Sequence, residues 1–119
     1  MEKVTGIGGL FFRAKDPDAL GRWYRDMLGV DLVPTSAEGR PWQQEAGITI
    51  FAPFASDTDY FAADKAFMLN FRVSDMDAMV AQLRAGGTEV TEKDGEGFGR
   101  FAHLSDPEGT PIELWEPPG

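Results

Sequence analysis

Apolar residues recur at helical spacing in two stretches of the chain. In the first stretch the apolar stripe is formed by Leu20, Trp23, Tyr24, Met27 and Leu28. Asp16-Pro17 precedes this stripe and Gly29 follows it. Asp accepts hydrogen bonds from the free amides of a first helical turn, Pro suits the first helical position, and Gly commonly follows the last turn. The pattern therefore predicts a helix between Asp16 and Gly29.

The second stretch carries the same signals in the same order. Its apolar stripe is formed by Met76, Met79, Val80 and Leu83. Asp75 stands before the stripe as a cap, and Gly86-Gly87 stands after it. A second helix is therefore predicted between Asp75 and Gly86.

Short runs that favour extended structure surround both predicted helices. The predicted strands are 7–14, 31–34, 41–45, 47–52, 67–73, 88–93, 99–104 and 111–116. Residues 54–66 have no clear period, although their aromatic content suggests that they pack on something. We interpret residues 1–119 as a single domain that contains a first module at about 5–53, a linker at about 54–66 and a second module at about 67–117.

The two modules also share sequence at a constant offset. Phe12–Leu20 returns 59 residues later as Phe71–Met79, with Phe, Arg, both Asp residues and Ala identical. Each module reads as strand, helix and three strands, so the predicted fold is α+β with two tandem βαβββ modules. Because a helix covers only one face of each sheet, the two free faces would form a cup-shaped mixed sheet with a binding site between the modules.

Composition and charge narrow the class of protein. The chain has 119 residues, of which 42% are hydrophobic and 12% aromatic, enough for a core. The formal net charge of −9 opposes binding to nucleic acid or to an anionic membrane. There is no cysteine, which excludes disulfides and thiolate chemistry. Since neither a membrane-spanning run nor a signal pattern is found, we expect a cytoplasmic protein that binds a small molecule.

Several motifs together resemble the vicinal oxygen chelate superfamily, which contains glyoxalase I, extradiol dioxygenases and the bleomycin and fosfomycin resistance proteins. The most specific motif is D-P-x-G-x-x-x-E-L at Asp106–Leu114, followed by the helix end Trp23-Tyr24-x-x-x-Leu28-Gly29. The resemblance covers nearly the whole chain. It implies the βαβββ cup, and it implies a homodimer because members of this length usually pair.

The resemblance also implies four positions for metal ligands, two in each module. In this chain they are occupied by Gly9, Thr49, Met68 and Glu113. Only Glu113 is a usual ligand for Mg, Mn, Fe or Zn, and one carboxylate holds such ions poorly. We therefore expect no catalytic metal, and Glu113 is a metal ligand only if an ion binds.

Strand alternation predicts which side chains line the cup. The predicted ligand-binding residues are Phe11, Arg13, Trp42, Thr49, Phe51, Met68, Asn70, Phe101 and Trp115. Their aromatic content favours a flat or apolar ligand, while core packing is the simpler interpretation of each single aromatic. Arg13 and Arg72 occupy equivalent positions and either clamp an anionic ligand or pair with the acidic surface.

His103 is the only histidine, and together with Glu113 it forms the candidate catalytic pair. If the turn between the last two strands is symmetric about Glu108, His103 lies opposite Glu113 and Phe101 lies opposite Trp115. A histidine beside a carboxylate suits acid–base chemistry, although a hydrogen-bonded strand residue is the simpler interpretation.

Three functions follow from these observations. The first is a binding protein that holds a small, partly hydrophobic or aromatic molecule in the cup without a catalytic metal. The second is a metal-dependent lyase, isomerase or dioxygenase that uses Glu113, with His103 as a further ligand. The third is metal-free acid–base catalysis by His103 and Glu113.

Overall fold

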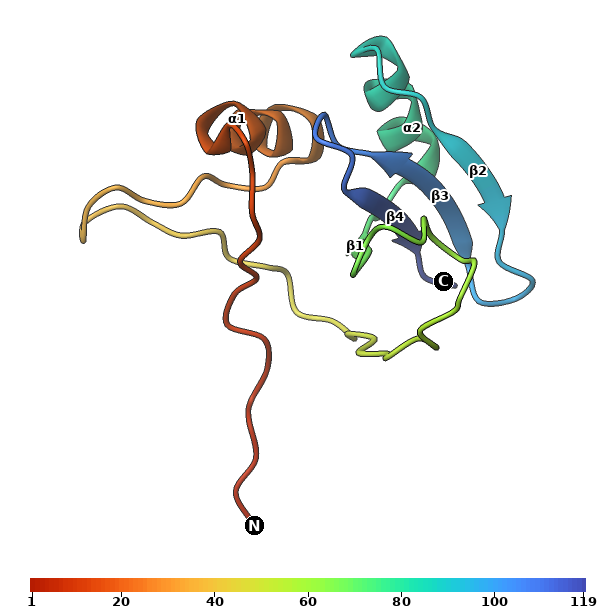
Figure 1. Cartoon of the computed structure of the whole chain (residues 1–119), viewed down its shortest axis with the longest axis horizontal. Helices are drawn as coiled ribbons and strands as arrows, with labels where there is room; N and C mark the ends of the chain where they lie inside the picture. The colour runs from red at the N-terminus through yellow and green to blue at the C-terminus, as the bar shows by residue number, and fades with distance from the viewer.

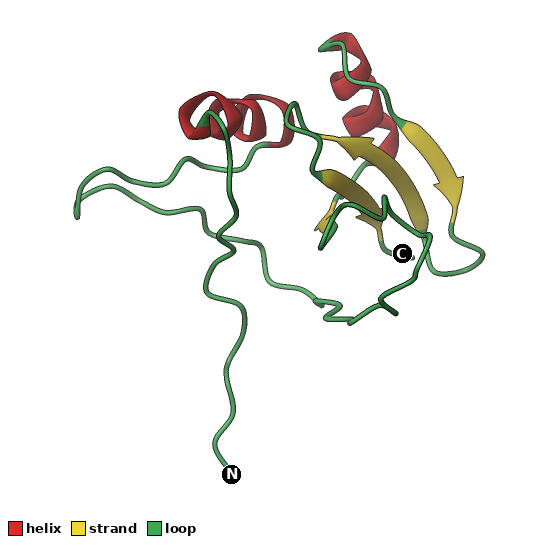
Figure 2. Cartoon of the chain, viewed as in Figure 1, coloured by secondary structure: helices red, strands yellow, loops and turns green.

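The computed structural model describes residues 1–119 and contains two helices and four strands. In chain order they are α1 (Pro17–Leu28), β1 (Leu69–Arg72), α2 (Met76–Ala85), β2 (Thr91–Asp94), β3 (Arg100–Ser105) and β4 (Pro111–Glu116). The predicted α+β class is confirmed. Figure 2 shows the strands together in one sheet beside the helices, with long loops elsewhere. All the strands belong to the second half of the chain, and α1 is the only regular element before them.

Both helices begin and end where the sequence signals predicted. The Asp16 carboxylate accepts a hydrogen bond from the Ala19 amide at 3.1 Å, and the Asp75 carboxylate accepts one from the Ala78 amide at 3.0 Å. Gly29 ends α1 in a left-handed conformation with φ of 75°, which glycine adopts without a steric penalty. The local signals are therefore sufficient to define both helices.

The four strands form one sheet in the order β1–β4–β3–β2, in which β1 runs parallel to β4 and the other pairs are antiparallel. The strands predicted at 67–73, 99–104 and 111–116 are confirmed within one or two residues at each end. The strand predicted at 88–93 begins later, at Thr91. The reason is that the Thr88 amide still bonds to the Leu83 carbonyl and closes the end of α2.

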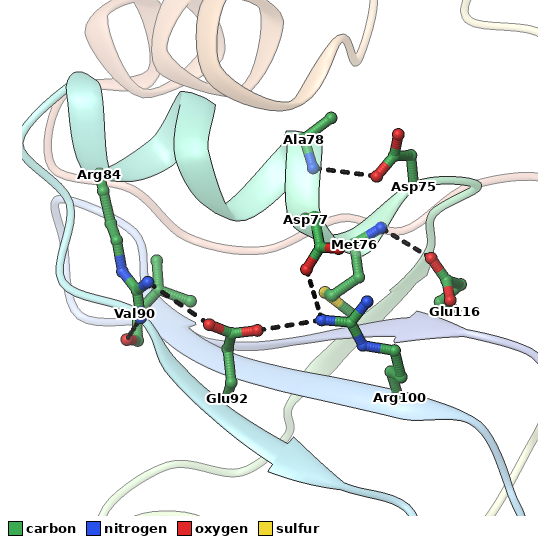
Figure 3. A network of polar contacts seen from close by, with 9 residues as sticks. All are labelled: Asp75, Met76, Asp77, Ala78, Arg84, Val90, Glu92, Arg100 and Glu116. Carbon is green, nitrogen blue, oxygen red and sulfur yellow. Dashed lines mark hydrogen bonds and ion pairs between the residues drawn. The ribbon is translucent and has the colours of Figure 1, made fainter.

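The core lies between α2 and the sheet. Met76, Leu83, Ile112 and Leu114 are its largest fully buried side chains. Polar contacts add to this packing at the helix start, where the Glu116 carboxylate accepts a hydrogen bond from the Met76 amide at 2.7 Å. In Figure 3, Arg100 of β3 reaches Asp77 of α2 at 2.7 Å and Glu92 of β2 at 3.2 Å. The second module is thus a complete βαβββ unit.

Helix α1 packs on the second module. Leu20 and Tyr24 belong to the same buried cluster as the α2 and sheet residues. The Tyr24 hydroxyl donates to Asp106 at 2.7 Å, in the turn between β3 and β4. The Glu108 carboxylate of that turn accepts from the Lys15 amide at 2.6 Å. The first helix is therefore attached to the second module and does not cover a sheet of its own.

The four strands predicted before residue 53 do not form within the chain. Segments 7–14, 31–34, 41–45 and 47–52 have no strand assignment. Figure 1 shows the N-terminal segment extending away from the sheet until it nears α1, where Phe12 and Ala14 pack against the core, while the segment that follows α1 loops out on another side. A strand needs a neighbouring backbone to pair its amides and carbonyls, and the chain supplies none here. The second sheet of the predicted cup is therefore absent from the single chain.

Candidate functional site

The antiparallel pairing of β3 and β4 creates the candidate site. Phe101 lies opposite Trp115, and His103 lies opposite Glu113, as the symmetric turn predicted. The turn is held by the Asp106 carboxylate, which accepts hydrogen bonds from the Glu108 amide at 2.8 Å and the Thr110 amide at 3.0 Å. Asp106 therefore sets the register that brings the site residues to one face of the sheet.

Glu113 is a buried carboxylate with a partner on each oxygen. Only 6% of its surface is exposed. His103 Nε2 lies 2.7 Å from Glu113 Oε2, and Asn70 Nδ2 donates to Oε1 at 2.7 Å. The Tyr60 hydroxyl donates to Oε2 as well. A carboxylate taken out of water is costly unless such donors replace its hydration, and here they come from three separate segments.

Tyr60 is the site residue that sequence analysis missed. It belongs to the linker, which crosses the sheet and places the Tyr60 ring edge-on to His103 with centroids 5.3 Å apart. The Lys93 ammonium lies 5.4 Å from the Tyr60 ring centroid. Partial burial and the bond to Glu113 raise the pKa of Tyr60 to about 12. The aromatic content of the linker indicated packing, but without a period it could not indicate which surface.

Phe101, which is half-buried, and Trp115, which is only 9% exposed, lie on the same face of the sheet. Their rings are nearly parallel, with an angle of 7° between planes and 6.3 Å between centroids. The indole Nε1 of Trp115 donates to the Phe98 carbonyl at 2.8 Å, which ties the loop after β2 to the sheet. Phe101 lies two residues from His103 along β3, and Trp115 lies two residues from Glu113 along β4, so all four side chains are on the same face.

The other second-module candidates lie near this face or at its edge. Asn70 bonds to Glu113, which confirms that it points to the predicted side. Met68 lines a cavity of about 540 Å³ under the linker, together with Phe54, Phe61 and Phe67. Glu113 and His103 do not line that cavity. Arg72 donates to the Glu45 carbonyl at 3.0 Å and so is engaged by the first module.

The first-module candidates are not brought to the site by their own chain. Phe11 and Phe51 are 96% and 81% exposed, and Arg13 and Thr49 are exposed as well. Trp42 lies against Phe71, whose ring packs on the core. The structure therefore gathers most of the second-module candidates on one face, and it leaves four first-module candidates in solvent, namely Phe11, Arg13, Thr49 and Phe51.

The residues around Glu113 do not fit a catalytic divalent metal. Such an ion generally needs about three protein ligands and open positions for substrate. The structure contains no group of three or more His, Cys, Asp or Glu side chains that could hold a metal ion. His103 is the only other usual ligand beside Glu113, and both carboxylate oxygens already accept hydrogen bonds. This geometry therefore supports no metal-dependent step.

Comparison with known proteins places the whole chain in one family. Residues 9–115 match the family model of the glyoxalase-like domain. Among curated proteins, no sequence matches the chain.

No helix is both long and apolar enough to span a membrane.

Three solved structures share the fold over nearly the full length. TnmS3, an antibiotic binding protein from Streptomyces sp. CB03234, is 25% identical with a TM-score of 0.67, and the match covers 99% of this chain and 100% of that one. A glyoxylase/bleomycin resistance protein/dioxygenase domain from Frankia sp. EAN1pec is 17% identical, with a TM-score of 0.64 and coverage of 98% and 100%. Lactoylglutathione lyase from Agrobacterium tumefaciens is 18% identical, with a TM-score of 0.63 and coverage of 97% and 96%.

Proposed function

We propose that this chain, which belongs to the glyoxalase-like domain family, is a cytoplasmic, homodimeric protein that binds a small aromatic or partly hydrophobic molecule without a catalytic metal. The observation that carries the proposal is the face formed by β3 and β4. There a stacked aromatic pair lies beside a buried carboxylate with three hydrogen-bond partners. Apolar surface with a few polar groups is the usual composition of a ligand site.

The comparison with TnmS3 supports this proposal over a catalytic one. That protein is described as antibiotic binding, and the similarity extends over both chains almost completely. A site for a small organic molecule needs apolar contact and a few oriented polar groups, and the half-buried Phe101 and the carboxylate of Glu113 are the candidates for these roles here.

The hydrogen bond of Tyr60 indicates how a ligand would be recognised. The phenol donates to Glu113 from a linker residue that is 40% exposed. A ligand hydroxyl in the same place would donate the same bond to the carboxylate, while its ring system would lie over the Phe101–Trp115 pair. We therefore expect the ligand to carry a phenol or another hydrogen-bond donor on a flat ring system.

A fluorescence titration tests this proposal. The probe is 1,8-dihydroxyanthraquinone, a flat molecule with phenolic donors, and the signal is the tryptophan emission of the protein. We expect saturable quenching, and binding about tenfold weaker or worse in Glu113→Gln, because a hydrogen bond to a charged group is worth about 1.5–3 kcal/mol. Glu96→Gln is the matched control, since it makes the same change of charge on an exposed side chain in the loop after β2.

Two results would count against the proposal. If Glu113→Gln and the parent protein bind the probe with equal affinity, Glu113 does not contribute to ligand binding. A stoichiometric divalent ion in protein purified without chelators, lost in Glu113→Ala, would overturn the metal-free part. Repeating the titration with a chelator and with Mn²⁺ separates binding by the protein alone from binding that needs a metal ion.

A second candidate, acid–base catalysis, rests on the distance of 2.7 Å between His103 Nε2 and Glu113 Oε2. The His103 side chain is 20% exposed, so a substrate can reach the imidazole while Glu113 orients it. Proton exchange at carbon next to the carbonyl of an aryl ketone, followed by NMR in D₂O, tests it. Exchange that is accelerated by the parent protein and lost in His103→Gln supports this candidate, and equal exchange in both removes it.

A further inference from the structure

The linker at residues 54–66 is attached to the sheet by a single hydrogen bond. Its two backbone hydrogen bonds are both local, and each closes a turn within the linker itself. Of its side chains, only Tyr60 makes a hydrogen bond to the sheet, and the acceptor is Glu113 of β4. Since no other polar contact joins the linker to the sheet, the position of the linker over the site depends strongly on this one phenol.

The remaining contacts of the Tyr60 ring are individually weak. The ring lies edge-on to His103, with 5.3 Å between centroids, and it is tilted against Phe54 at 5.7 Å. The Lys93 ammonium lies 5.4 Å from its centroid. Aromatic and cation–π contacts at such exposed positions each contribute only about 0.5–1.5 kcal/mol. Tyr60 is also outside the buried core cluster, so its ring can turn into water without opening that core.

The Tyr60 hydroxyl occupies a position on Glu113 that a ligand would need. Asn70 donates to Oε1, whereas Oε2 is in contact with both His103 and Tyr60. A carboxylate oxygen has two lone-pair sites, so Oε2 has no site left for a third partner. Asn70 and His103 belong to strands and are held by the register of the sheet. Tyr60 is the one partner that can leave while the sheet stays intact.

We propose that Tyr60 is a latch, whose hydroxyl closes the empty site by bonding to Glu113 and which a ligand must displace in order to bind. This inference rests on the proposed binding function and deepens it, because it names the group with which the ligand competes. The displaced group is a phenol, so a ligand that carries a phenolic hydroxyl on an aromatic ring returns to Glu113 the bond that it removes.

The latch changes the affinity of the site for every ligand by the same factor. A protein whose binding-competent form is only partly populated binds more weakly in proportion to that population. Aromatic molecules that lack a donor suffer a further loss, because they displace the phenol and leave a buried carboxylate with one bond fewer. Molecules of that kind should therefore not occupy the site at concentrations at which a phenol does.

The affinity of Tyr60→Phe tests the latch. This substitution keeps the ring and removes only the hydroxyl, and the probe is again 1,8-dihydroxyanthraquinone, followed by quenching of tryptophan emission. We expect about tenfold tighter binding than in the parent protein, because the site no longer has to be opened. Tyr24→Phe is the matched control, since it removes a hydroxyl that donates to a different carboxylate, Asp106, at 2.7 Å. It should leave the affinity unchanged.

A second pair of variants shows whether the gain comes from the bond to Glu113. In the Glu113→Gln background the acceptor is a neutral amide, which forms a weaker hydrogen bond than a carboxylate does. The additional substitution Tyr60→Phe should then tighten binding by only about twofold. A full tenfold gain in this background would overturn the assignment of the latch to the Tyr60–Glu113 bond.

Fluorine NMR detects the displacement itself. The chain has only two tyrosines, so protein labelled with 3-fluorotyrosine gives two resonances, which Tyr24→Phe assigns. Saturation with the probe should move the Tyr60 resonance toward that of free 3-fluorotyrosine and leave the Tyr24 resonance in place. Saturable binding with an unmoved Tyr60 resonance would overturn the latch.

The outcomes separate the latch from the binding function on which it rests. If Tyr60→Phe and the parent protein bind the probe equally well, or if the variant binds more weakly, the site binds ligand but Tyr60 is not its competitor. If neither protein binds the probe, the proposed binding function fails and the latch fails with it. Tighter binding by Tyr60→Phe, together with the moved resonance, supports both.

Discussion

The two halves of the chain share their sequence signals but differ in structure. Both have an Asp cap followed by an amphipathic helix, and in both the helix forms. Both also have strand patterns, yet only the second half forms a sheet. The difference shows that a helix makes its backbone hydrogen bonds within its own segment. A strand makes them with a neighbouring strand, which the local sequence does not specify.

The largest expected difference in unfolding free energy is between a substitution in the second module, which forms a sheet, and one in the first module, which does not. Leu114→Ala, at a fully buried position, should cost about 2–5 kcal/mol of unfolding free energy, because it leaves a cavity in a packed core. Ile50→Ala should stay within about 0.5 kcal/mol of the parent protein, because the Ile50 side chain is 69% exposed in the chain. Urea unfolding of the two variants measures both losses. An equal loss in the two variants would show that Ile50 is buried as deeply as Leu114.

The next effect should be equal in the two halves. Asp16→Ala and Asp75→Ala each remove one cap bond, at 3.1 and 3.0 Å, and each should cost about 1 kcal/mol. Thermal unfolding of the two variants measures this cost, with Asp16→Asn and Asp75→Asn as controls that retain a cap. A cost in only one helix would mean that the repeat preserves the sequence of the cap without its energetic role.

The smallest effect concerns the two tyrosines that connect earlier segments to carboxylates of the second module. Burial and Asp106 raise the pKa of Tyr24, and burial and Glu113 raise the pKa of Tyr60 to about 12. Because the folded values exceed the ordinary value of 10.0, their contribution to stability is complete below pH 10 and falls as the pH rises above it. Absorbance of tyrosinate at alkaline pH should show the earlier step disappearing in Tyr60→Phe.

The matched variant for this titration is Tyr24→Phe, since the chain has only two tyrosines. It should leave the step near pH 12 in place. Ionisation of Tyr60 at its ordinary pKa in the parent protein would show that the phenol does not contact Glu113 in solution.

Part of the candidate site could be predicted from the sequence. The turn at Asp106–Thr110 determines the β3–β4 register, so the pairing of His103 with Glu113 and of Phe101 with Trp115 followed from strand alternation. The same alternation correctly placed Asn70 beside Glu113. Tyr60 could not be predicted, because its segment has no period and its position depends on which surface the linker crosses.

By itself the sequence determined the two helices, their caps, the strands of the second module and the family resemblance. These features depend on contacts a few residues apart or on a short turn, where side-chain chemistry decides the backbone. Only the tertiary structure decided that α1 packs on the second module, that Tyr60 covers Glu113, and that the first-module strands find no partner in their chain. Those outcomes depend on which surfaces that are distant in the sequence pack against each other. A strand pattern indicates that a segment needs a hydrogen-bonding neighbour, but it does not identify that neighbour.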